Sequence, residues 1–297
     1  MDLLKQAIVN ADDFGLTTEI NQGIIRAFEE GIVTSTSLSA NGEAFRDAVA
    51  LIKTTPSLDV GIHLTLVEER PVLPPQTIPS LVDNTGRFRK SAQLFFVDYL
   101  KGKISMQEVK MEFHAQAKKI LDQGISITHI DSHQHIHILP KVANITVELA
   151  EEYGIKHIRY PKEDMEFRKI LSTREIKRFV QQIGVNFFCL YSRNRLKNYS
   201  LDHFFGFYDG GRLDKEKIID ILRKMGRGTS ELMCHPGLGR NPNIPSGYTD
   251  WDYAWGVELD SLIDEEIKDV ISREDIQLIN FSSLLGKSLY RRGNIGR

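Results

Sequence analysis

Short apolar runs alternate with amphipathic segments along almost the whole chain of 297 residues. The runs have the length of β-strands, and the segments between them repeat their apolar residues every three or four positions, as helices do. The candidate strands are Gln6–Asn10, Val33–Ala40, Asp59–Leu64, Ser126–Asp131, Lys156–Tyr160, Asn186–Leu190, Glu231–Cys234 and Ile276–Asn280. Alternation of this kind predicts a parallel sheet whose strands are joined by covering helices.

The amphipathic segments carry signals for the start and the end of helices. One helix is expected after Thr18, a capping residue type, and is expected to end at Gly31. The other expected helices are Val109–Leu121, Lys141–Tyr153, Lys215–Met225 and Ser261–Ser272. Seven or eight repeats in a chain of this length predict a (β/α) barrel of the α/β class, either complete or incomplete. An open, doubly wound sheet is the alternative.

The chain is predicted to form a single domain over residues 1–297. It contains no repeat, low-complexity stretch or linker that would separate a second unit. Two stretches, near residues 71–102 and 237–255, are expected to be loop insertions, because they are rich in turn-forming residues. In a barrel, long loops at the carboxyl ends of the strands build the substrate pocket.

Charge and cysteine content exclude several classes of function. The formal net charge is −2, so the chain lacks the basic surface that binds nucleic acid. Two cysteines, Cys189 and Cys234, are too few for a disulfide framework or a cysteine-based zinc site. There is no signal-peptide pattern and no apolar stretch of transmembrane length. We therefore expect a cytoplasmic protein with no nucleic-acid partner and no transmembrane segment.

Two adjacent acids, Asp12 and Asp13, follow the first apolar run. Strand side chains alternate between faces, so the two carboxylates are expected to point in different directions. One of them would then be able to bind a metal while the other accepts a proton. The alternative is a role in a turn or a helix cap, for which aspartate is also favoured.

Two histidines stand at the ends of further runs. His63 ends the third run, and His235 follows the seventh run just before Pro236-Gly237. Such a histidine is often a packed core or turn residue, but His235 is also a candidate general acid or oxyanion partner. Carboxylates and imidazoles from separate strand ends form the ligand set of a hydrolytic metal site. The sequence therefore predicts a metal-dependent hydrolase.

The segment from His129 to His137 has histidine or aspartate at every second position, namely His129, Asp131, His133, His135 and His137. On an extended chain these five side chains would share one face. Pro140 begins a predicted helix and limits how far the chain can stay extended. We therefore expect one or two of them to bind a metal and the others to support the ligands or line the pocket. A histidine cluster without any role is the alternative.

Five segments together resemble the YdjC-like carbohydrate deacetylase family. The resemblance covers most of the chain and keeps the family's order, although residues 71–102 and 160–205 contribute no motif. The matching segments are Val9–Leu16 (Val-Asn-Ala-Asp-Asp-Phe-Gly-Leu), Gly31–Ser37, Gly61–Leu64, Thr128–His137 and Cys234–Gly237.

The resemblance implies a distorted (β/α) barrel that hydrolyses N-acetyl groups on sugars with one divalent ion. By motif position, the metal ligands would be Asp13, His63 and His133. Asp12 would then be the catalytic base, and His235 a candidate acid. Two imidazoles favour zinc, while a carboxylate and waters also suit magnesium, so the sequence leaves the ion as Mg²⁺ or Zn²⁺.

The substrate implied by the resemblance is an acetylated sugar or glycolipid, and the sequence does not distinguish the two. Tyr248, Trp251 and Tyr253 are candidates for stacking on the sugar rings; a hydrophobic plug or a subunit contact is an equally good interpretation. Two other functions stay open, a barrel metallohydrolase such as a phosphoesterase and a non-catalytic carbohydrate-binding protein. The oligomeric state is also open, with a homodimer as one alternative.

Overall fold

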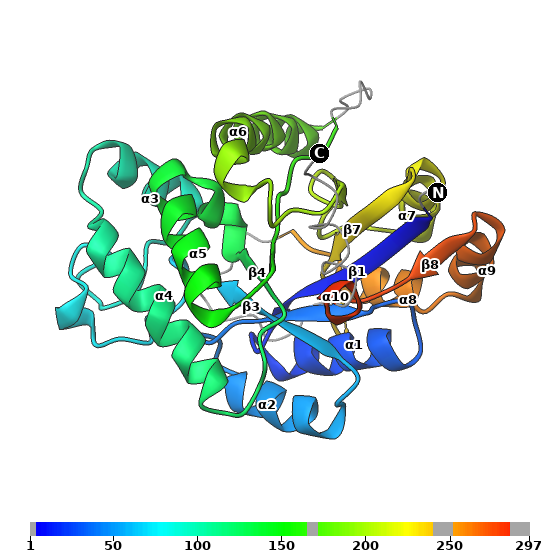
Figure 1. Ribbon diagram of the computed structural model, residues 1–297, viewed down its shortest axis with the longest axis horizontal. Helices are drawn as coiled ribbons and strands as arrows, with labels where there is room; N and C mark the ends of the chain where they lie inside the picture. Colours follow the sequence, from blue (N-terminus) through cyan, green and yellow to red (C-terminus); the bar gives the residue numbers. More distant parts are fainter. Residues whose placement is uncertain (1–3, 165–171, 240–251, 286–297) are drawn as a thin grey trace, which may run out of the picture.

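The computed structural model of the protein describes residues 4–164, 172–239 and 252–285. Eight parallel strands form its sheet, and Figure 1 shows them as a curved surface with helices around it. The strands are β1 (Lys5–Phe14), β2 (Ser35–Leu38), β3 (Asp59–Leu64), β4 (His129–Ser132), β5 (His157–Ile158), β6 (His203–Phe205), β7 (Gly228–Cys234) and β8 (Ile276–Leu278). Seven of the eight predicted strands are thus present, and the bounds predicted for β3 agree with those in the structure.

The helices cover the outside of the sheet, with α4 and α5 on one side and α8 and α9 on the opposite side (Figure 1). The α-helices are α1 (Thr18–Glu29), α2 (Phe45–Thr54), α3 (Ala92–Leu100), α4 (Met106–Leu121), α5 (Pro140–Tyr153), α6 (Thr173–Leu196), α7 (Lys215–Lys224), α8 (Trp255–Leu262), α9 (Glu265–Arg273) and α10 (Phe281–Leu285). Two short 3₁₀ helices are η1 (Pro75–Thr77) and η2 (His133–Ile138). The predicted insertion at 71–102 therefore contains η1 and the whole of α3.

The sheet does not close into a complete barrel. Its strand order is β5-β4-β3-β2-β1-β7-β6, with β8 paired to the first residues of β1. Within the described residues no ladder joins β5 to β6. The prediction of a distorted (β/α) barrel is therefore confirmed, and the barrel is incomplete.

β1 lies at the centre of the sheet and is buried from Ala7 onward. It pairs with β2 on one side and with β7 on the other, where Ala11 is opposite Cys234. A strand that is covered on both faces has a continuous apolar run, and Ala7-Ile8-Val9 has this composition. The strand therefore carries its carboxyl end, with Asp12 and Asp13, into the middle of the molecule.

The predicted strand Asn186–Leu190 is wrong, because these residues lie inside the 24-residue helix α6. The run Asn-Phe-Phe-Cys-Leu is short and apolar, and periodicity alone does not separate such a run from a helix segment. The strand of this repeat is β6, which follows α6 and was missed. Only three residues long, β6 begins with an exposed His203 and so has little strand pattern.

Two of the helix predictions also need correction. The predicted helix Ser261–Ser272 is two helices, because Asp264 ends α8 and caps α9 by accepting a hydrogen bond from Glu266 N. The cap of α1 is Thr17 and not Thr18, since Thr17 Oγ1 accepts from Ile20 N. The prediction for α5 is confirmed to within one residue, including the left-handed Gly154 that follows it.

Candidate active site

The side chains singled out in the sequence lie at the carboxyl ends of four strands. β1 carries Asp12 and Asp13 at its end, β3 carries His63, and β4 is followed by His133. The fourth strand, β7, is followed by His235. Because the strands are parallel, their carboxyl ends meet at one edge of the sheet, which is where barrels place their sites.

Asp13 interrupts the regular geometry of β1. Its φ is +67°, in the left-handed region that is uncommon for residues other than glycine, and the ladder with β2 shifts register between Ala11 and Phe14. One oxygen of the Asp13 carboxylate lies 3.3 Å from His63 Nε2 and 3.3 Å from His133 Nδ1. The bulge therefore directs Asp13 toward the two histidines. The sequence analysis expected Asp12 and Asp13 to point in different directions, and the structure shows this arrangement.

Asp13, His63 and His133 form a compact group of three buried side chains. His63 Nε2 and His133 Nδ1 are 3.3 Å apart, and one donor atom from each of the three residues lies within 4.8 Å of the others. One carboxylate oxygen and two imidazole nitrogens fit a divalent ion that keeps open positions for water or substrate. The three residues predicted from the family motifs are thus brought together.

The two histidines are held by further carboxylates. His63 Nδ1 is 2.8 Å from Asp131 Oδ1, and His133 Nε2 is 2.8 Å from Glu68 Oε2. A metal-binding histidine commonly donates its other ring N–H to such a partner, which fixes the ring and its tautomer. Glu68 was missed in the sequence, where it lies in a loop with no motif. Glu68 differs from its neighbours in its backbone φ of +68°, a feature that only the structure reveals.

Negative charge dominates this group. Burial by itself lowers the pKa of His63, but the Asp131 and Asp13 carboxylates outweigh it and raise the pKa to about 10. Burial likewise lowers the pKa of His133, whereas Asp13 and Glu68 raise it to about 9. Burial raises the pKa of Asp13, and the two histidines more than offset this and hold it below its usual range. The arrangement therefore attracts positive charge, either as protons or as a cation.

Asp12 faces a different partner, the buried Arg159. The guanidinium donates from Nη1 to Asp12 Oδ2 at 2.5 Å and from Nη2 to Asp12 Oδ1 at 2.7 Å. Asn10 Nδ2 donates a third hydrogen bond to the same carboxylate at 2.9 Å. A planar bidentate pair of this kind fixes the orientation of the carboxylate. The two adjacent acids thus have separate surroundings.

Arg159 also contacts two more buried carboxylates. Its Nη2 is 2.8 Å from Asp131 Oδ2, and its Nε donates to Glu231 Oε1 at 2.7 Å. Burial lowers the pKa of Arg159, but Asp12, Asp131 and Glu231 raise it well above its usual value. The sequence analysis missed this arginine, because it directly follows the two-residue strand β5, in a region without a motif.

A second group, Asp12, His63 and Asp131, also has donor atoms within 4.8 Å of one another. It fits a cation poorly. Arg159 holds both oxygens of Asp12 and one oxygen of Asp131, so an ion there would lie against a buried guanidinium. Among the described residues, Asp13, His63 and His133 are therefore the better ligand set.

The five residues from His129 to His137 do not lie on one extended face, in line with the limit on extension that Pro140 led us to expect. β4 ends at Ser132, and the chain then turns into η2, in which Gln134 and His135 have φ of 52° and 55°. Of the five, His133 contacts both Asp13 and His63, and Asp131 contacts His63 alone of the two. The physical reason is the tight turn before Pro140, which ends the alternation of side chains.

The other histidines of this segment are buried, and two of them have partners within the fold. His129 stacks on Phe281 with ring centroids 3.9 Å apart, and burial lowers its pKa to about 3. His137 contacts Ser132 Oγ at 2.6 Å and the Arg159 carbonyl at 2.8 Å, and burial lowers its pKa to about 4. Both rings are therefore neutral near pH 7, and His137 links η2 to the strand end that carries Arg159.

His235 lies at the end of β7, next in register after the pair Ala11 and Cys234. Its backbone N–H donates to Glu258 Oε2 at 2.5 Å, and its Nδ1 is 3.8 Å from the same oxygen. Nδ1 is buried and has no hydrogen-bond partner within the described part of the chain. The buried Glu258 on α8 was not singled out in the sequence, and burial raises its pKa. Through its hydrogen bond to the backbone of His235, Glu258 orients the loop that carries this histidine.

Of the three aromatic residues predicted to contact a sugar, Tyr248 and Trp251 lie outside the described residues. The ring of Tyr253 lies 4.9 Å from that of His235 and 5.2 Å from that of Trp255. It also packs against Gly211, where any Cβ would come within 2.1 Å of the Tyr253 ring. Tyr253 therefore forms part of the wall beside His235.

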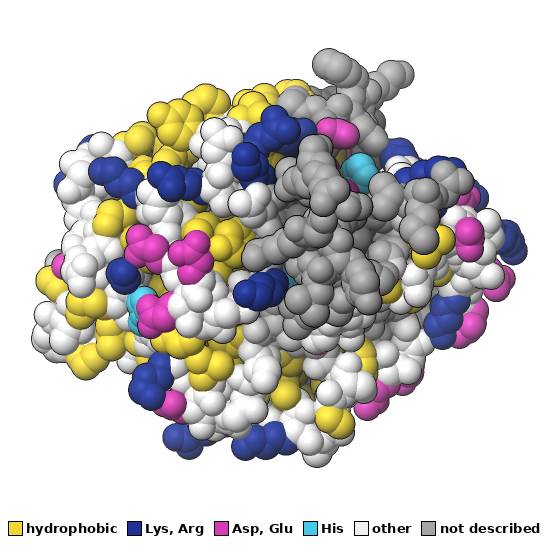
Figure 2. Space-filling model, viewed as in Figure 1, with side chains coloured by type: hydrophobic (Ala, Val, Ile, Leu, Met, Phe, Trp, Pro, Cys, Tyr) yellow, Lys and Arg dark blue, Asp and Glu magenta, His cyan; other side chains and the backbone are white. Residues whose placement is uncertain are grey.

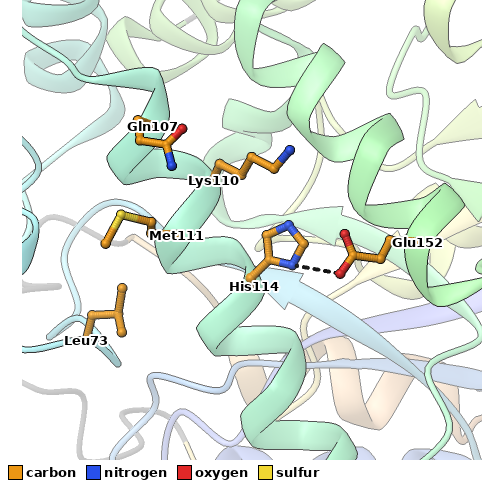
Figure 3. A pocket seen from close by; sticks show the side chains of 6 residues that line it. All are labelled: Leu73, Gln107, Lys110, Met111, His114 and Glu152. Carbon is orange, nitrogen blue, oxygen red and sulfur yellow. Dashed lines mark ion pairs between the residues drawn. The ribbon is translucent and has the colours of Figure 1, made fainter.

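A separate surface depression of about 500 Å³ lies over α4 (Figure 3). Its residues are Leu73, Gln107, Lys110, Met111, His114 and Glu152. The ion pair drawn there joins His114 Nδ1 to Glu152 Oε1 at 3.6 Å, and more than half of the Glu152 side chain is exposed. This depression is open to solvent and shares no residue with the buried cluster.

None of the helices in the described parts of the chain has the length and hydropathy needed to cross a membrane.

Comparisons with known proteins agree with this geometry. A carbohydrate deacetylase of Clostridium beijerinckii is 33% identical over 280 residues, which cover 93% of this chain and 99% of the relative. A carbohydrate deacetylase of Brevibacillus brevis is 35% identical over 279 residues, covering 93% and 98%. Among solved structures, an Enterococcus faecalis protein provisionally assigned to cellobiose-phosphate cleavage matches with a TM-score of 0.74. It is 28% identical, and the match covers 95% of this chain and 99% of that one. The family model described as YdjC-like protein matches residues 6–273, and the chain therefore belongs to the YdjC-like protein family.

Proposed function

We propose that the protein is a metal-dependent deacetylase that hydrolyses the N-acetyl group of an acetylated carbohydrate. The observation that carries the proposal is the buried group of Asp13, His63 and His133 next to an Asp12 that Arg159 holds in place. The names of the two relatives at 33% and 35% identity support the same reaction class. An acetylated sugar and an acetylated glycolipid are both substrates of this class.

In this proposal Asp13, His63 and His133 hold one divalent ion, Zn²⁺ or Mg²⁺. A bound ion would lower the pKa of a water molecule and stabilise negative charge on the acetyl oxygen. Asp131 and Glu68 keep the two imidazole rings in the tautomer that leaves one nitrogen free for the ion. These five residues are buried, so the reacting groups would work in surroundings with little competing water.

Asp12 is the proposed general base, because the other two carboxylates beside the ligand group that are not ligands, Asp131 and Glu68, each contact a ligand histidine. Arg159 and Asn10 fix its orientation through three hydrogen bonds. A base must lie within hydrogen-bond reach of the proton that it accepts, and a fixed carboxylate meets this requirement without reorganisation. Arg159 is thus a positioning residue for Asp12.

His235 is the proposed general acid for the departing nitrogen. An amine is a poor leaving group unless it receives a proton as the bond to carbon breaks. The buried Nδ1 of His235 has no hydrogen-bond partner among the described residues and lies 3.8 Å from Glu258 Oε2, so it is available to a substrate. The aromatic wall of Tyr253 beside it gives a surface on which a pyranose ring can pack.

Release of acetate tests the proposal directly. The purified protein is treated with a chelator, reloaded with Zn²⁺ or Mg²⁺, and mixed with N-acetylated oligosaccharides while free acetate is measured. We expect acetate from the reloaded protein and none from the chelated protein. A panel that includes acetylated glycolipids distinguishes the two substrate classes. Absence of acetate from all substrates with a fully occupied metal site would contradict the proposal.

A further inference from the structure

A second pocket is lined by residues from the start of α6, the loop after β6 and the start of α7. Its volume is about 240 Å³, and four cationic side chains line it. Figure 2 shows Lys and Arg side chains on the surface over α6 and over α7, the two helices that Figure 1 places on this side of the molecule. Two acidic side chains, Glu175 and Asp209, also line the pocket, so its cations exceed its acids by two. The cations of this pocket, which we call the arginine pocket, are Arg174, Arg178, Arg212 and Lys217.

Arg178 is the cation of the arginine pocket that forms no ion pair within the described residues. The other three cations pair with Asp252 or Asp214. Arg178 Nη2 donates to the Gly210 carbonyl at 2.7 Å, but its Nε is buried and has no hydrogen-bond partner in the described chain. A buried N–H without an acceptor costs free energy, and a ligand that accepts from it removes this cost. The Nε of Arg178 is therefore a donor for a bound acceptor atom.

The guanidinium groups of this pocket repel one another. Burial lowers the pKa of Arg174, and the charges of Arg178 and Arg212 lower it further. Arg174 and Arg178 meet at Gly210, because both donate to its carbonyl oxygen, at 3.4 and 2.7 Å. Like charges held this close cost folding free energy, and an oxyanion bound among them would offset the repulsion. Phosphate and carboxylate groups are the oxyanions that guanidinium groups bind through paired hydrogen bonds.

The loop after β6, which forms one wall of the pocket, is held in a fixed conformation. The two carboxylate oxygens of Glu163 accept hydrogen bonds from Gly206 N and Tyr208 N, each at 2.8 Å. The guanidinium of Arg178 lies over the Phe207 ring, with its Cζ 5.3 Å from the ring centroid. A site whose backbone and side chains are already in place binds its ligand with less loss of conformational entropy.

Tyr253 connects the arginine pocket with the candidate active site. Its ring lies 4.9 Å from that of His235. Burial raises the pKa of its hydroxyl to about 12, while the positive charge of Arg178 opposes the rise and the Asp13 carboxylate adds to it. Tyr253 is thus close enough to both groups for their charges to act on it. A sugar ring packed on Tyr253 would have its acetamide on the side of His235 and another substituent on the side of Arg178.

We propose that the arginine pocket binds an oxyanion carried by the substrate, a phosphate ester or a carboxylate, and that Arg178 selects for it. Arg178 donates to the oxyanion from Nε, and Arg174 and Arg212 add positive charge around it. The substrate class is then an acidic acetylated sugar and not a neutral one. The inference rests on the proposed function for the identity of the ligand as an acetylated sugar, but binding of the oxyanion requires no reaction.

Calorimetric titration of the full chain tests this binding directly. The probes are N-acetylglucosamine, its 6-phosphate, and N-acetylmuramic acid, which carries a carboxylate. At least one of the two acidic sugars should bind about 10- to 100-fold more tightly than the neutral sugar, the range expected for one hydrogen bond to a charged group. The more tightly bound acidic sugar identifies the oxyanion. Added salt should reduce the difference in affinity, because it screens the charges of a pocket that is open to solvent.

Each titration is carried out with and without a chelator. The preference for the acidic sugar should be the same under both conditions, because the arginine pocket shares no residue with the group of Asp13, His63 and His133. A preference that disappears with the chelator would place the oxyanion on a bound metal ion and would overturn the proposal.

Substitution of Arg178 tests its role in the selection. Arg178→Gln removes the charge and should abolish the preference, whereas Arg178→Lys, which keeps the charge but not the planar group, should retain part of it. The matched control is Arg193→Gln, the same change at an exposed residue of α6 roughly 22 Å further along the helix, which should keep the full preference. Arg174→Gln should also reduce the preference, which provides a second variant if Arg178→Gln does not fold.

Two further results would overturn the proposal. The first is equal affinity of the wild-type protein for neutral and acidic sugars, or no binding of either acidic sugar at millimolar concentration. The second is a preference that Arg178→Gln leaves intact. Acetate release from the same probes separates this inference from the proposed function. Release from the neutral sugar without any preference would contradict the arginine pocket alone, whereas preferential binding without release would support the pocket and contradict the deacetylase proposal.

Discussion

At the scale of single residues, the site depends on charges that compensate one another out of water. Arg159 contacts Asp12, Asp131 and Glu231, and burial still raises the pKa of Glu231 to about 7. His63 and His133 stand between Asp13 and further carboxylates. Each charged group thus has a partner of opposite sign, which is the condition for burying such groups. Single substitutions at different residues of this site should therefore affect metal binding, catalysis and stability separately.

The ligand assignment predicts a loss of metal in two single variants. His63→Ala and His133→Ala each remove one of three ligands, so metal content measured by elemental analysis should fall well below one ion per chain. The matched control is His114→Ala on α4, a partly exposed histidine paired with Glu152 far from the site, which should keep the wild-type content. Full occupancy in both site variants would show that the ion is held elsewhere.

The role of Asp12 predicts a different outcome. Asp12→Asn keeps the shape of the side chain but cannot accept the proton from water, so kcat should fall by about two to four orders of magnitude. Its metal content should be unchanged, because Asp12 is held by Arg159 and lies outside the proposed ligand set. Loss of the ion from this variant would mean that the roles of Asp12 and Asp13 are exchanged.

Replacing Arg159 should lower the free energy of unfolding more than replacing any one of the proposed metal ligands does. Arg159→Met leaves three buried carboxylates without their cation, and breaking a buried pair in this way costs about 3–5 kcal/mol of unfolding free energy. Denaturant unfolding of the metal-free protein measures this change in the free energy of unfolding. Arg89→Met, which removes a more exposed ion pair with Asp98, is the control and should cost about 1 kcal/mol or less. Equal losses in the two variants would contradict the buried network as the source of stability.

At the scale of elements, β3 and β4 illustrate how a strand end is positioned by close packing. Gly61 lies opposite the His129 ring, and the stack of His129 on Phe281 of α10 lies behind it. The register His63 opposite Asp131 then brings the imidazole to its carboxylate. The absence of a side chain at Gly61 therefore leaves the room that the His129 ring occupies beside β3.

Gly61→Ala should test this packing. A Cβ at Gly61 would lie 2.4 Å from His129 Nε2, so the ring and Phe281 must shift, at a cost of about 1–3 kcal/mol in unfolding free energy. The control is Gly226→Ala, whose Cβ would come no closer than 3.7 Å to another side chain and should change stability little. Thermal unfolding compares the two; an equally stable Gly61→Ala would mean that His129 moves away freely.

At the scale of the whole molecule, the buried histidines give the metal-free protein a characteristic dependence on pH. The folded-state pKa values of His63 and His133, about 10 and about 9, lie above the ordinary value of 6.5. Such groups contribute stability that is fully present below pH 6.5 and is lost as the pH rises through the folded values. His129 and His137, with lowered pKa values, act in the opposite sense and cost stability as the pH falls below 6.5.

We therefore expect the melting temperature of the chelated protein to fall between pH 7 and pH 10. The metal-loaded protein should not show this fall, because a bound ion takes the place of the two protons and its affinity rises as they leave. Differential scanning fluorimetry with and without a chelator measures both curves. A chelated protein whose melting temperature is constant across this range would contradict the charge state assigned to His63 and His133.

Most of the fold was predictable from the sequence because its strands are buried and separated by amphipathic helices. The alternation identified seven of the strands, and the parallel arrangement alone required that their carboxyl ends meet. Asp12, Asp13, His63, His133 and His235 were found for that reason: each stands at the end of an apolar run. The strand predicted inside α6 failed because a short apolar run does not by itself distinguish a strand from a helix segment, and Phe187 and Leu190 of that run are exposed.

The sequence by itself therefore determined the class of fold, the edge of the sheet that carries the site and the residue types available there. The tertiary structure decided which of these residues meet. Glu68, Arg159 and Glu258 come from loops or elements without a motif, and their partners are 23 to 147 residues away in the chain. The left-handed turn at Asp13 and the tight turn after Ser132 selected one carboxylate and one of four histidines. Such contacts depend on long-range packing and on backbone turns, neither of which a local pattern of apolar and polar residues encodes.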